Sequence, residues 1–293
     1  MPMNYNRKQF LKLSSGLACG ALIAQSGCTL FQPLSKNNQL TDFGLQLYTL
    51  RDTFETDPMG TIKQLAGAGY KFLEGYERSK GIFWGSKSTD FMKFVDDLGM
   101  SFVASHCDTE NNFEKKANEA AAVGMKYLIS AWEGPDRSIE WYKQFAEKLN
   151  SWGNICKKAG IGFAFHNHSF SFEKREGIIP QKILMQYTDA ALVDFELDIF
   201  WAAVAGENAA EWIAKYPNRF KLGHFKDLNK SPGNDNDKNS VDLGEGSIDI
   251  SNTFKSGVEN GMKYFFVEQE YCHNGTPLQT VLKNAQYMRQ LKF

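Results

Sequence analysis

The sequence lacks an excess of either charge and lacks an ordered cysteine pattern. Its 33 Lys and Arg residues offset 34 Asp and Glu residues, which leaves a formal net charge of -1. Proteins that bind nucleic acid neutralise its phosphates with a basic excess, so we do not expect a nucleic-acid partner. The five cysteines are odd in number and no two have zinc-knuckle spacing. Neither a disulfide framework nor a cysteine zinc site is therefore predicted.

Two further absences concern membranes and nucleotides. The apolar run 17–24 is shorter than the roughly 20 residues that a membrane-spanning helix needs. No glycine-rich phosphate loop follows the first strand-like run, where the chain reads Thr49-Leu50-Arg51-Asp52. An open, doubly wound sheet that binds a nucleotide is expected to carry such a loop there. The composition, with 42% hydrophobic and 23% charged residues, is otherwise that of an ordinary globular chain.

The first 30 residues have the features of an export leader, and 31–39 read as a polar tether. Arg7 and Lys8 form a basic start, which resembles a twin-arginine export signal with lysine in place of the second arginine. Small residues lead to Cys28 and resemble the end of a lipoprotein cleavage box. We therefore expect an exported protein, either periplasmic or anchored to a membrane through a lipid on Cys28, with simple cleavage as the alternative.

From residue 40 onward, short apolar strands alternate with amphipathic helical stretches. Strands are predicted at 43–48, 70–74, 101–106, 126–131, 161–166, 191–197, 219–225 and 264–268. Helices are predicted at 61–68, 89–98, 113–123, 138–159, 180–187, 207–215, 248–260 and 277–291. Glycines that follow helical stretches fit C-terminal caps, namely Gly69, Gly99, Gly124, Gly160 and Gly261. Eight such units predict an α/β fold, a closed (β/α)₈ TIM barrel that forms one domain over 40–293.

The strand ends carry side chains that bind metals or move protons. In a barrel of this kind the active site forms at the C-terminal ends of the strands. The residues there are Glu74, His106, Asp108, Trp132, Glu133, His166, His168, Glu196, Asp198, His224, Lys226, Asp227, Glu268 and Glu270, with His273 just beyond the last strand. Residues two apart share one face of a strand, so His166 and His168 point the same way. A cluster of imidazole and carboxylate groups suits Mn²⁺, Co²⁺, Zn²⁺ or Fe²⁺ better than Ca²⁺.

These residues lie in strings that resemble the xylose isomerase-like barrels, often called sugar phosphate isomerases/epimerases. The strings are Leu45-Gln46-Leu47-Tyr48-Thr49-Leu50-Arg51-Asp52, Phe165-His166-Asn167-His168, Phe195-Glu196-Leu197-Asp198, His224-Phe225-Lys226-Asp227 and Phe266-Val267-Glu268-Gln269. The resemblance spans about residues 40–293 and implies one divalent metal ion, held by residues of four late strands. Asp198, His224 and Glu268 match three of the four ligands. His166 stands where many epimerases have glutamate, and His168 is the alternative ligand.

The resemblance implies an isomerase or epimerase of a keto sugar, which transfers a proton through an enediolate stabilised by the ion. The expected export indicates that this sugar is unphosphorylated. The expected catalytic groups are Glu268, Lys226 and His166, and a lowered pKa beside the metal would let Lys226 act as a base. The expected substrate contacts are Gln46, Tyr48, Glu74, His106, Trp132, His168 and Glu196. The partner is a small-molecule sugar, and the oligomeric state is left open.

Two other functions stay open at this point. A lyase or dehydratase acting on a keto-glycoside or an inosose-like substrate would use the same enediolate to expel a β-leaving group. The expected export favours an unphosphorylated substrate, since phosphorylated sugars are scarce outside the cytoplasm, and the strand ends carry no arginine cluster. A non-catalytic sugar-binding lipoprotein would keep an aromatic mouth, but it would not need Asp198, His224 and Glu268 together. His166, in place of a carboxylate, also puts a simple two-glutamate epimerase mechanism in question.

Overall fold

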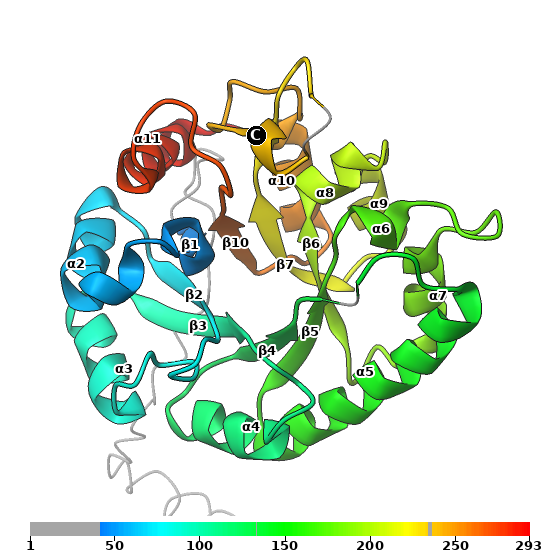
Figure 1. Cartoon of the computed structure of the whole chain (residues 1–293), viewed down its shortest axis with the longest axis horizontal. Coiled ribbons are helices and arrows are strands. Elements are labelled where there is room, and N and C mark those ends of the chain that lie inside the picture. The colour runs from blue at the N-terminus through cyan, green and yellow to red at the C-terminus, as the bar shows by residue number, and fades with distance from the viewer. Residues whose placement is uncertain (1–41, 133, 234–235) are drawn as a thin grey trace, which may run out of the picture. The chain divides into compact units, whose positions relative to one another are not determined.

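A computed structural model describes residues 42–293, apart from 133, 234 and 235 (Figure 1). Eight parallel strands close into a barrel in the order β1-β10-β7-β6-β5-β4-β3-β2, with helices around the outside. The predicted TIM barrel is therefore confirmed. The predicted leader, tether and Cys28 anchor, and Glu133, lie outside the described residues. Among the helices of the described part, none combines the length and the apolar character needed to cross a membrane.

The barrel strands are short, and their residues are mostly buried because the core side chains lie inside and the helices pack outside. They are β1 (Gly44–Gln46), β2 (Phe72–Tyr76), β3 (Ser101–His106), β4 (Tyr127–Ser130), β5 (Gly162–His166), β6 (Asp194–Asp198), β7 (Phe220–Phe225) and β10 (Tyr264–Val267). A cluster of buried apolar side chains that includes Tyr127, Ile129, Leu222 and Phe266 belongs to the barrel strands. The polar residues at the C-terminal strand ends therefore adjoin a packed apolar core.

Ten α-helices pack around the barrel in the described part of the chain, and one of them shows capping at both of its ends. They are α2 (Pro58–Ala68), α3 (Ser88–Asp97), α4 (Phe113–Ala122), α5 (Ile139–Ala159), α6 (Ser169–Phe172), α7 (Pro180–Tyr187), α8 (Ile199–Val204), α9 (Ala209–Lys215), α10 (Ile250–Glu259) and α11 (Pro277–Gln290). The Ser138 side chain accepts a hydrogen bond from the Trp141 N–H at the start of α5. Gly160 ends the same helix with a φ of 90°, a left-handed conformation that glycine adopts without strain.

Two local features differ from the prediction. The first strand was expected to reach Tyr48, but it ends at Gln46 and continues as a short 3-10 helix, η1 (Leu47–Leu50). The Gln46 side chain supports this turn, because its oxygen accepts the Tyr48 N–H at 3.0 Å. Helices α6 and α8, in the loops after β5 and β6, were not predicted. After β7, β8 (Asp227–Leu228) and β9 (Ser240–Val241) form a small antiparallel pair.

Candidate metal centre and active site

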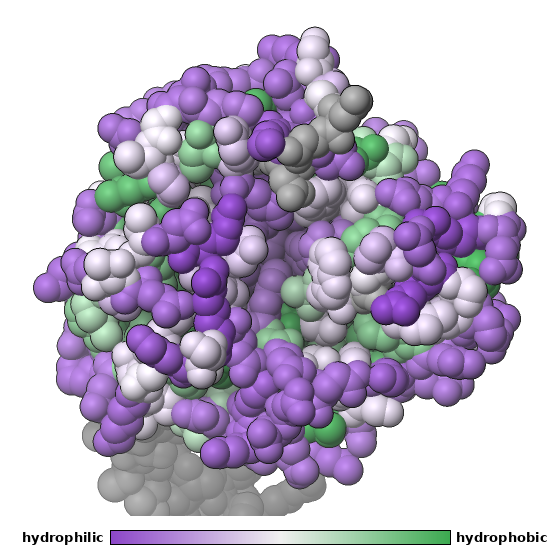
Figure 2. All heavy atoms as spheres, viewed as in Figure 1, coloured by the Kyte–Doolittle hydropathy of each residue, from purple (hydrophilic) through white to green (hydrophobic). Residues whose placement is uncertain are grey.

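A pocket of about 1280 Å³ opens at the C-terminal ends of the strands. Figure 2 shows the same face of the molecule, hollowed near its centre and rimmed mainly by hydrophilic residues. The predicted site residues that line this pocket are Tyr48, His106, Trp132, His166, His168 and Glu268. Gln46, Glu74 and Glu196 are buried and do not line it. Some of the predicted residues therefore form the pocket surface, and the others are buried polar side chains behind that surface.

The four predicted metal ligands come together at the base of the pocket. One donor atom from each ligand lies within 4.8 Å of the other three, and all four residues are buried, namely His166, Asp198, His224 and Glu268. His166 Nε2 lies 3.2 Å from His224 Nδ1 and 3.3 Å from Asp198 Oδ2, and His224 Nδ1 lies 3.0 Å from Glu268 Oε2. Neighbouring ligands of an ion bound at about 2.1 Å are separated by roughly 3.0 to 3.4 Å, so the spacing suits one ion.

The local structure leaves one oxygen of Asp198 available for this cluster. Asp198 ends β6 and caps α8, and its Oδ1 accepts the N–H groups of Phe200 at 3.0 Å and Trp201 at 3.2 Å. Asn167 fixes the same residue from the end of β5, since it donates to the Asp198 carbonyl at 3.2 Å and accepts the Asp198 N–H at 3.0 Å. The role of Asn167 was not predicted, although its position between the two histidines of the His-Asn-His string was a usable signal.

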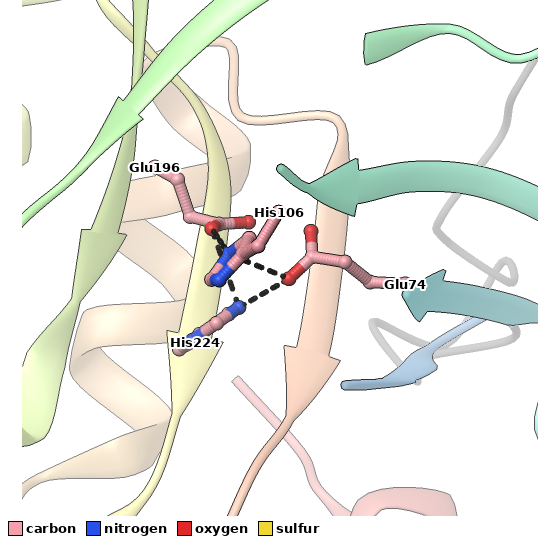
Figure 3. A group of neighbouring side chains, drawn as sticks. All are labelled: Glu74, His106, Glu196 and His224. Carbon is pink, nitrogen blue, oxygen red and sulfur yellow. Dashed lines mark hydrogen bonds and ion pairs between the residues drawn. The ribbon is translucent and has the colours of Figure 1, made fainter. Parts of the chain in front are cut away.

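Figure 3 shows a second group of donor residues, which shares His224 with the predicted ligands. His224 Nε2 is 2.6 Å from Glu74 Oε1 and 3.3 Å from Glu196 Oε2. His106 Nε2 is 2.8 Å from Glu196 Oε2 and 3.2 Å from Glu74 Oε1. Gln46 adds a hydrogen bond of 2.6 Å to the same Glu74 oxygen. We call Glu74, His106, Glu196 and Gln46 the lower layer, and His224 joins it to the predicted ligands because its two ring nitrogens face opposite ways.

We call the predicted ligands His166, Asp198, His224 and Glu268 the upper group. Its position at the pocket makes it the better place for a catalytic ion. A catalytic ion keeps a coordination position open to substrate. His166 and Glu268 of the upper group line the pocket, whereas His106 alone among the residues of the lower layer does so. A metal-bound histidine is usually held through its other ring nitrogen by a carboxylate. Glu74 has that position relative to His224, so the lower layer has the geometry of a support for the ligand.

Lys226 lies beside the upper group as a buried cation. Its Nζ is 2.7 Å from Asp198 Oδ2, 2.8 Å from Glu268 Oε2 and 3.2 Å from Glu270 Oε1, and the residue is 1% exposed. Burial alone would lower the pKa of Lys226, but the three carboxylates outweigh burial and raise that pKa well above its ordinary value. The predicted lowering of the Lys226 pKa is therefore wrong, and Lys226 is an ammonium group that holds carboxylates in place.

The carboxylates around the pocket have contrasting proton affinities. For Glu268, burial opposes ionisation, but Lys226 and His224 outweigh burial and lower the pKa. Glu270 lines the pocket, and its pKa is raised to about 7 by burial, which Lys226 opposes and Glu268 reinforces. Burial and the nearby Glu74 raise the pKa of Glu196 to about 8. Glu270, which the sequence placed among the strand-end residues but not among the expected catalytic groups, is thus a pocket carboxylate with a pKa near neutrality.

Burial lowers the pKa of both histidines of the His-Asn-His string. Burial is the main cause that lowers the pKa of His166 well below its usual value, and neutral imidazole is the form that binds a metal. Burial, followed by the Lys226 charge, lowers the pKa of His168 to about 3. The His168 ring lies 5.0 Å from the His166 ring, but His168 contributes no atom to the ligand group. The geometry therefore favours His166 over His168 as the ligand from β5.

Asp227, Asp108 and His273 lie outside the cluster. The buried Asp227 carboxylate accepts four backbone N–H groups, from Leu228, Gly244, Gly246 and Ile248, at 2.9 to 3.0 Å. This makes it an anchor for the loop after β7. Asp108 accepts the Glu110 N–H in the loop after β3, and His273 contacts the Lys238 carbonyl on the exposed rim. These residues shape the loops around the pocket.

Comparisons with known proteins agree with this architecture, although no family model matches the chain. An inosose dehydratase of Clostridium perfringens is 25% identical over 289 residues, which cover 87% of this chain and 93% of the relative. Another inosose dehydratase, from Clostridium botulinum strain Eklund 17B, is 26% identical over the same shares. Both alignments cover nearly the whole of the relative.

Solved structures show the same barrel. A sugar phosphate isomerase/epimerase from Parabacteroides distasonis is 29% identical, with a TM-score of 0.72 over 84% of this chain and 93% of that chain. The IOLI protein, solved with a zinc atom, is 15% identical, with a TM-score of 0.68 over 86% of this chain and 99% of that chain, and it shares the fold. The resemblance predicted from the strand-end strings is confirmed at the level of the superfamily.

Proposed function

We propose that this xylose isomerase-like barrel is a metal-dependent lyase or dehydratase acting on an unphosphorylated keto sugar. It would remove the proton next to the carbonyl and then expel a leaving group from the β-carbon. The observation that carries the proposal is the group of four ligand atoms at the base of a wide pocket, next to the Lys226–Glu270 pair. The naming of the curated relatives as inosose dehydratases supports the choice of a sugar and of an elimination.

The residues of the upper group fit a divalent ion chemically. Two imidazoles and two carboxylates, from His166, His224, Asp198 and Glu268, form a donor set that suits Zn²⁺, Mn²⁺, Co²⁺ or Fe²⁺. Burial opposes protonation of His224, but Glu196, Glu268 and Glu74 outweigh burial and raise its pKa well above the ordinary value, so His224 would release a proton when an ion binds. When bound, such an ion polarises the carbonyl and the neighbouring hydroxyl of a sugar and so acidifies the C–H between them. Lys226 shares two of the carboxylates, which have enough lone pairs to accept both the ammonium and an ion.

Glu270 is the group best suited to move the proton. It lines the pocket, and its carboxylate, with a pKa near 7, can accept a proton from carbon and return it at neutral pH. Lys226 holds one Glu270 oxygen at 3.2 Å, and Arg51 donates to the Glu270 carbonyl at 2.8 Å. Return of the proton to the departing β-oxygen releases water or an alcohol and balances the reaction. Glu268 contacts both His224 and Lys226, which favours a ligand role for it over the base role expected from the sequence.

An isomerase or epimerase is the second candidate, and His106 is the observation that favours it. The His106 ring lines the pocket and contacts Glu196 at 2.8 Å, which places a proton carrier on a different wall from Glu270. Proton abstraction would be common to both reactions. A proton returned from the His106 side to the carbon that lost it would invert that carbon, and a proton returned to the former carbonyl carbon would move the carbonyl, whereas elimination returns the proton to the leaving oxygen. The fate of the proton therefore distinguishes the two candidates.

Pocket charges support an uncharged substrate. Arg51 and Arg78 line the rim, but Arg51 donates to the carbonyls of Tyr48 and Glu270, and Arg78 faces Glu55 at 3.8 Å. A phosphate group would have to compete for guanidinium groups that already have partners, and it would enter a pocket with several carboxylates. The site is better suited to sugar hydroxyls, which form hydrogen bonds without adding charge.

The test combines metal loading with reaction in D₂O. Protein loaded with Zn²⁺ or Mn²⁺ is incubated with keto sugars that carry a hydroxyl or an alkoxyl β to the carbonyl, and NMR follows the substrate C–H signal and any enone product. We expect loss of water or alcohol, which Glu270→Gln abolishes and the rim control Glu110→Gln leaves intact. Deuterium in an epimer or isomer without loss of the leaving group would favour the second candidate. Absence of both exchange and product for every metal would refute the enzyme proposal.

A further inference from the structure

We infer that the pocket takes a glycoside and not a free monosaccharide, with Trp132 forming the subsite for the ring beyond the reacting sugar. The inference rests on the proposed function, because it concerns what lies next to the reacting ring. It assigns a binding role to Trp132, Trp201 and His168, which line the pocket on the side of β4, β5 and β6. The ligand class is a keto sugar joined through oxygen to a second ring.

The size of the pocket is the first reason. Pockets of about 300 to 1,000 Å³ enclose drug-sized ligands, which already exceed one hexose. The volume here is about 1280 Å³, and the lining extends from Glu268 and His166 at the base to Trp132 at the rim. A monosaccharide held at the predicted ligands would leave the rim side of this volume filled by water alone. A second ring would fill it.

Trp132 has the position and the exposure of a stacking platform. Trp132 is 63% exposed, the highest value among the exposed large hydrophobic residues in the described part of the chain. Two neighbouring rings nevertheless fix its orientation, since His168 meets it edge to face at 4.8 Å and Phe170 at 5.3 Å. A large ring that is exposed at the pocket and held in place offers a flat apolar surface, and the apolar face of a sugar ring or an aromatic aglycone fits such a surface.

Aromatic rings form the pocket wall beside this platform. Trp201 and His168 both line the pocket, and their rings lie 5.7 Å apart. The His168 ring also stacks on Phe170 at 5.3 Å. A wall of packed aromatic rings next to Trp132 suits the apolar face of a second sugar ring.

His168 connects this subsite to the predicted ligands. Its ring lies 5.0 Å from the ring of the predicted ligand His166 and 4.8 Å from the ring of Trp132, measured between centroids. A sugar bound at the ligands would therefore have His168 and then Trp132 beside it along the pocket wall. The ring joined to it would lie against Trp132, with Trp201 and His168 between the two positions. The leaving group of the proposed elimination would then be the hydroxyl oxygen of this second ring or aglycone.

The experiment compares two probes on the wild type and three variants. The probes are the 3-keto derivatives of methyl glucoside and of cellobiose, so that they differ by one sugar ring. The proteins are the wild type, Trp132→Ala, and the control Tyr187→Ala, which removes an aromatic ring of 43% exposure that lies outside the pocket lining. KM and kcat are measured separately for each pair with the metal-loaded protein. Trp132→Phe is included to show whether a smaller ring restores binding.

We expect Trp132→Ala to raise KM for the cellobiose derivative roughly 10-fold, the effect of losing one stacked ring, with little change in kcat. KM for the methyl glucoside derivative should stay within about twofold, and Trp132→Phe should recover most of the loss. Equal KM values for both probes in the wild type, or an equal effect of Trp132→Ala on both, would overturn the subsite. If the wild type converts neither probe with any metal, the proposed function itself fails, which is a different result.

Discussion

Replacement of Glu74 by Gln tests how the ligand His224 is supported. Glu74 is fully buried, and its Oε1 accepts from His224 Nε2 at 2.6 Å and from Gln46 Nε2 at 2.6 Å. Glutamine keeps the shape but removes the charge that strengthens His224 as a ligand through its other nitrogen. Loss of such a partner typically weakens metal binding 10- to 100-fold, or about 1.4 to 2.7 kcal/mol. We therefore expect Glu74→Gln to bind Zn²⁺ within that range more weakly than the wild type.

Glu196→Gln is the matched control for this experiment. Glu196 is also fully buried, but its oxygen lies 3.3 Å from His224 Nε2, so it contributes less to the ligand. Competition against a fluorescent chelator gives the Zn²⁺ dissociation constant of each variant, and circular dichroism checks that each is folded. Affinity should decrease in the order wild type, Glu196→Gln, Glu74→Gln. Unchanged affinity of Glu74→Gln would refute the supporting role.

A third variant, His166→Ala, decides which group of donors holds the ion. His166 belongs only to the upper group, whereas Glu74 belongs only to the lower one. If the upper group binds the ion, His166→Ala loses more affinity than Glu74→Gln, because it removes a ligand and not a support. If His166→Ala binds normally and Glu74→Gln loses binding by far more than 100-fold, the ion lies in the lower layer and the assignment of the ligands is wrong.

Three further predictions concern pH, stability and the leader. Because Glu270 acts as a base only when ionised and its pKa is raised to about 7, kcat/KM should fall about tenfold per pH unit below pH 7; a flat profile down to pH 5 would exclude Glu270. Asp227→Asn should lower the free energy of unfolding, measured in urea, by about 3 kcal/mol, because an amide cannot accept all four N–H groups. The control Asp57→Asn, at an exposed helix N-cap, should change that free energy little. Cys28→Ser should move the protein from the membrane fraction to the soluble fraction of cells if the proposed lipid anchor exists, and an unchanged distribution counts against that anchor.

The barrel could be read from the sequence because its signals are local. Helix-ending glycines and short apolar strands recur along the chain, and Gly69 and Gly160 adopt the left-handed conformations that such caps need. The short helices α6 and α8 could not be predicted in this way. Helix α8 has six residues and depends on the Asp198 side chain, which caps it while also facing the cluster. Such a segment is stabilised by its site and not by its own helical propensity.

The strand ends also predicted which residues meet, but not how deep each one lies. Residues of one strand face were expected to share one environment, yet Glu196 lies in the lower layer and Asp198, two residues later, lies in the upper group. Each pair of residues along a strand advances almost 7 Å toward the mouth, which is enough to separate a support from a ligand. The pKa of Lys226 was beyond prediction for a related reason. Its carboxylate partners come from β6 and from the end of β10, so its charge depends on contacts between distant parts of the chain.

Histidine at position 166 has a consequence for the charge of the whole centre. If an ion binds, with His166 neutral and His224 having released its proton, the charges of Asp198 and Glu268 would balance those of one divalent ion. A glutamate at 166 would add a negative charge in a buried setting, where unbalanced charge is costly. Lys226 lies 3.2 Å from Glu270 and balances its charge when Glu270 is ionised. Asp198 and Glu268 could therefore both serve as ligands, while the proposed proton carrier Glu270 lies outside the ligand group but lines the pocket.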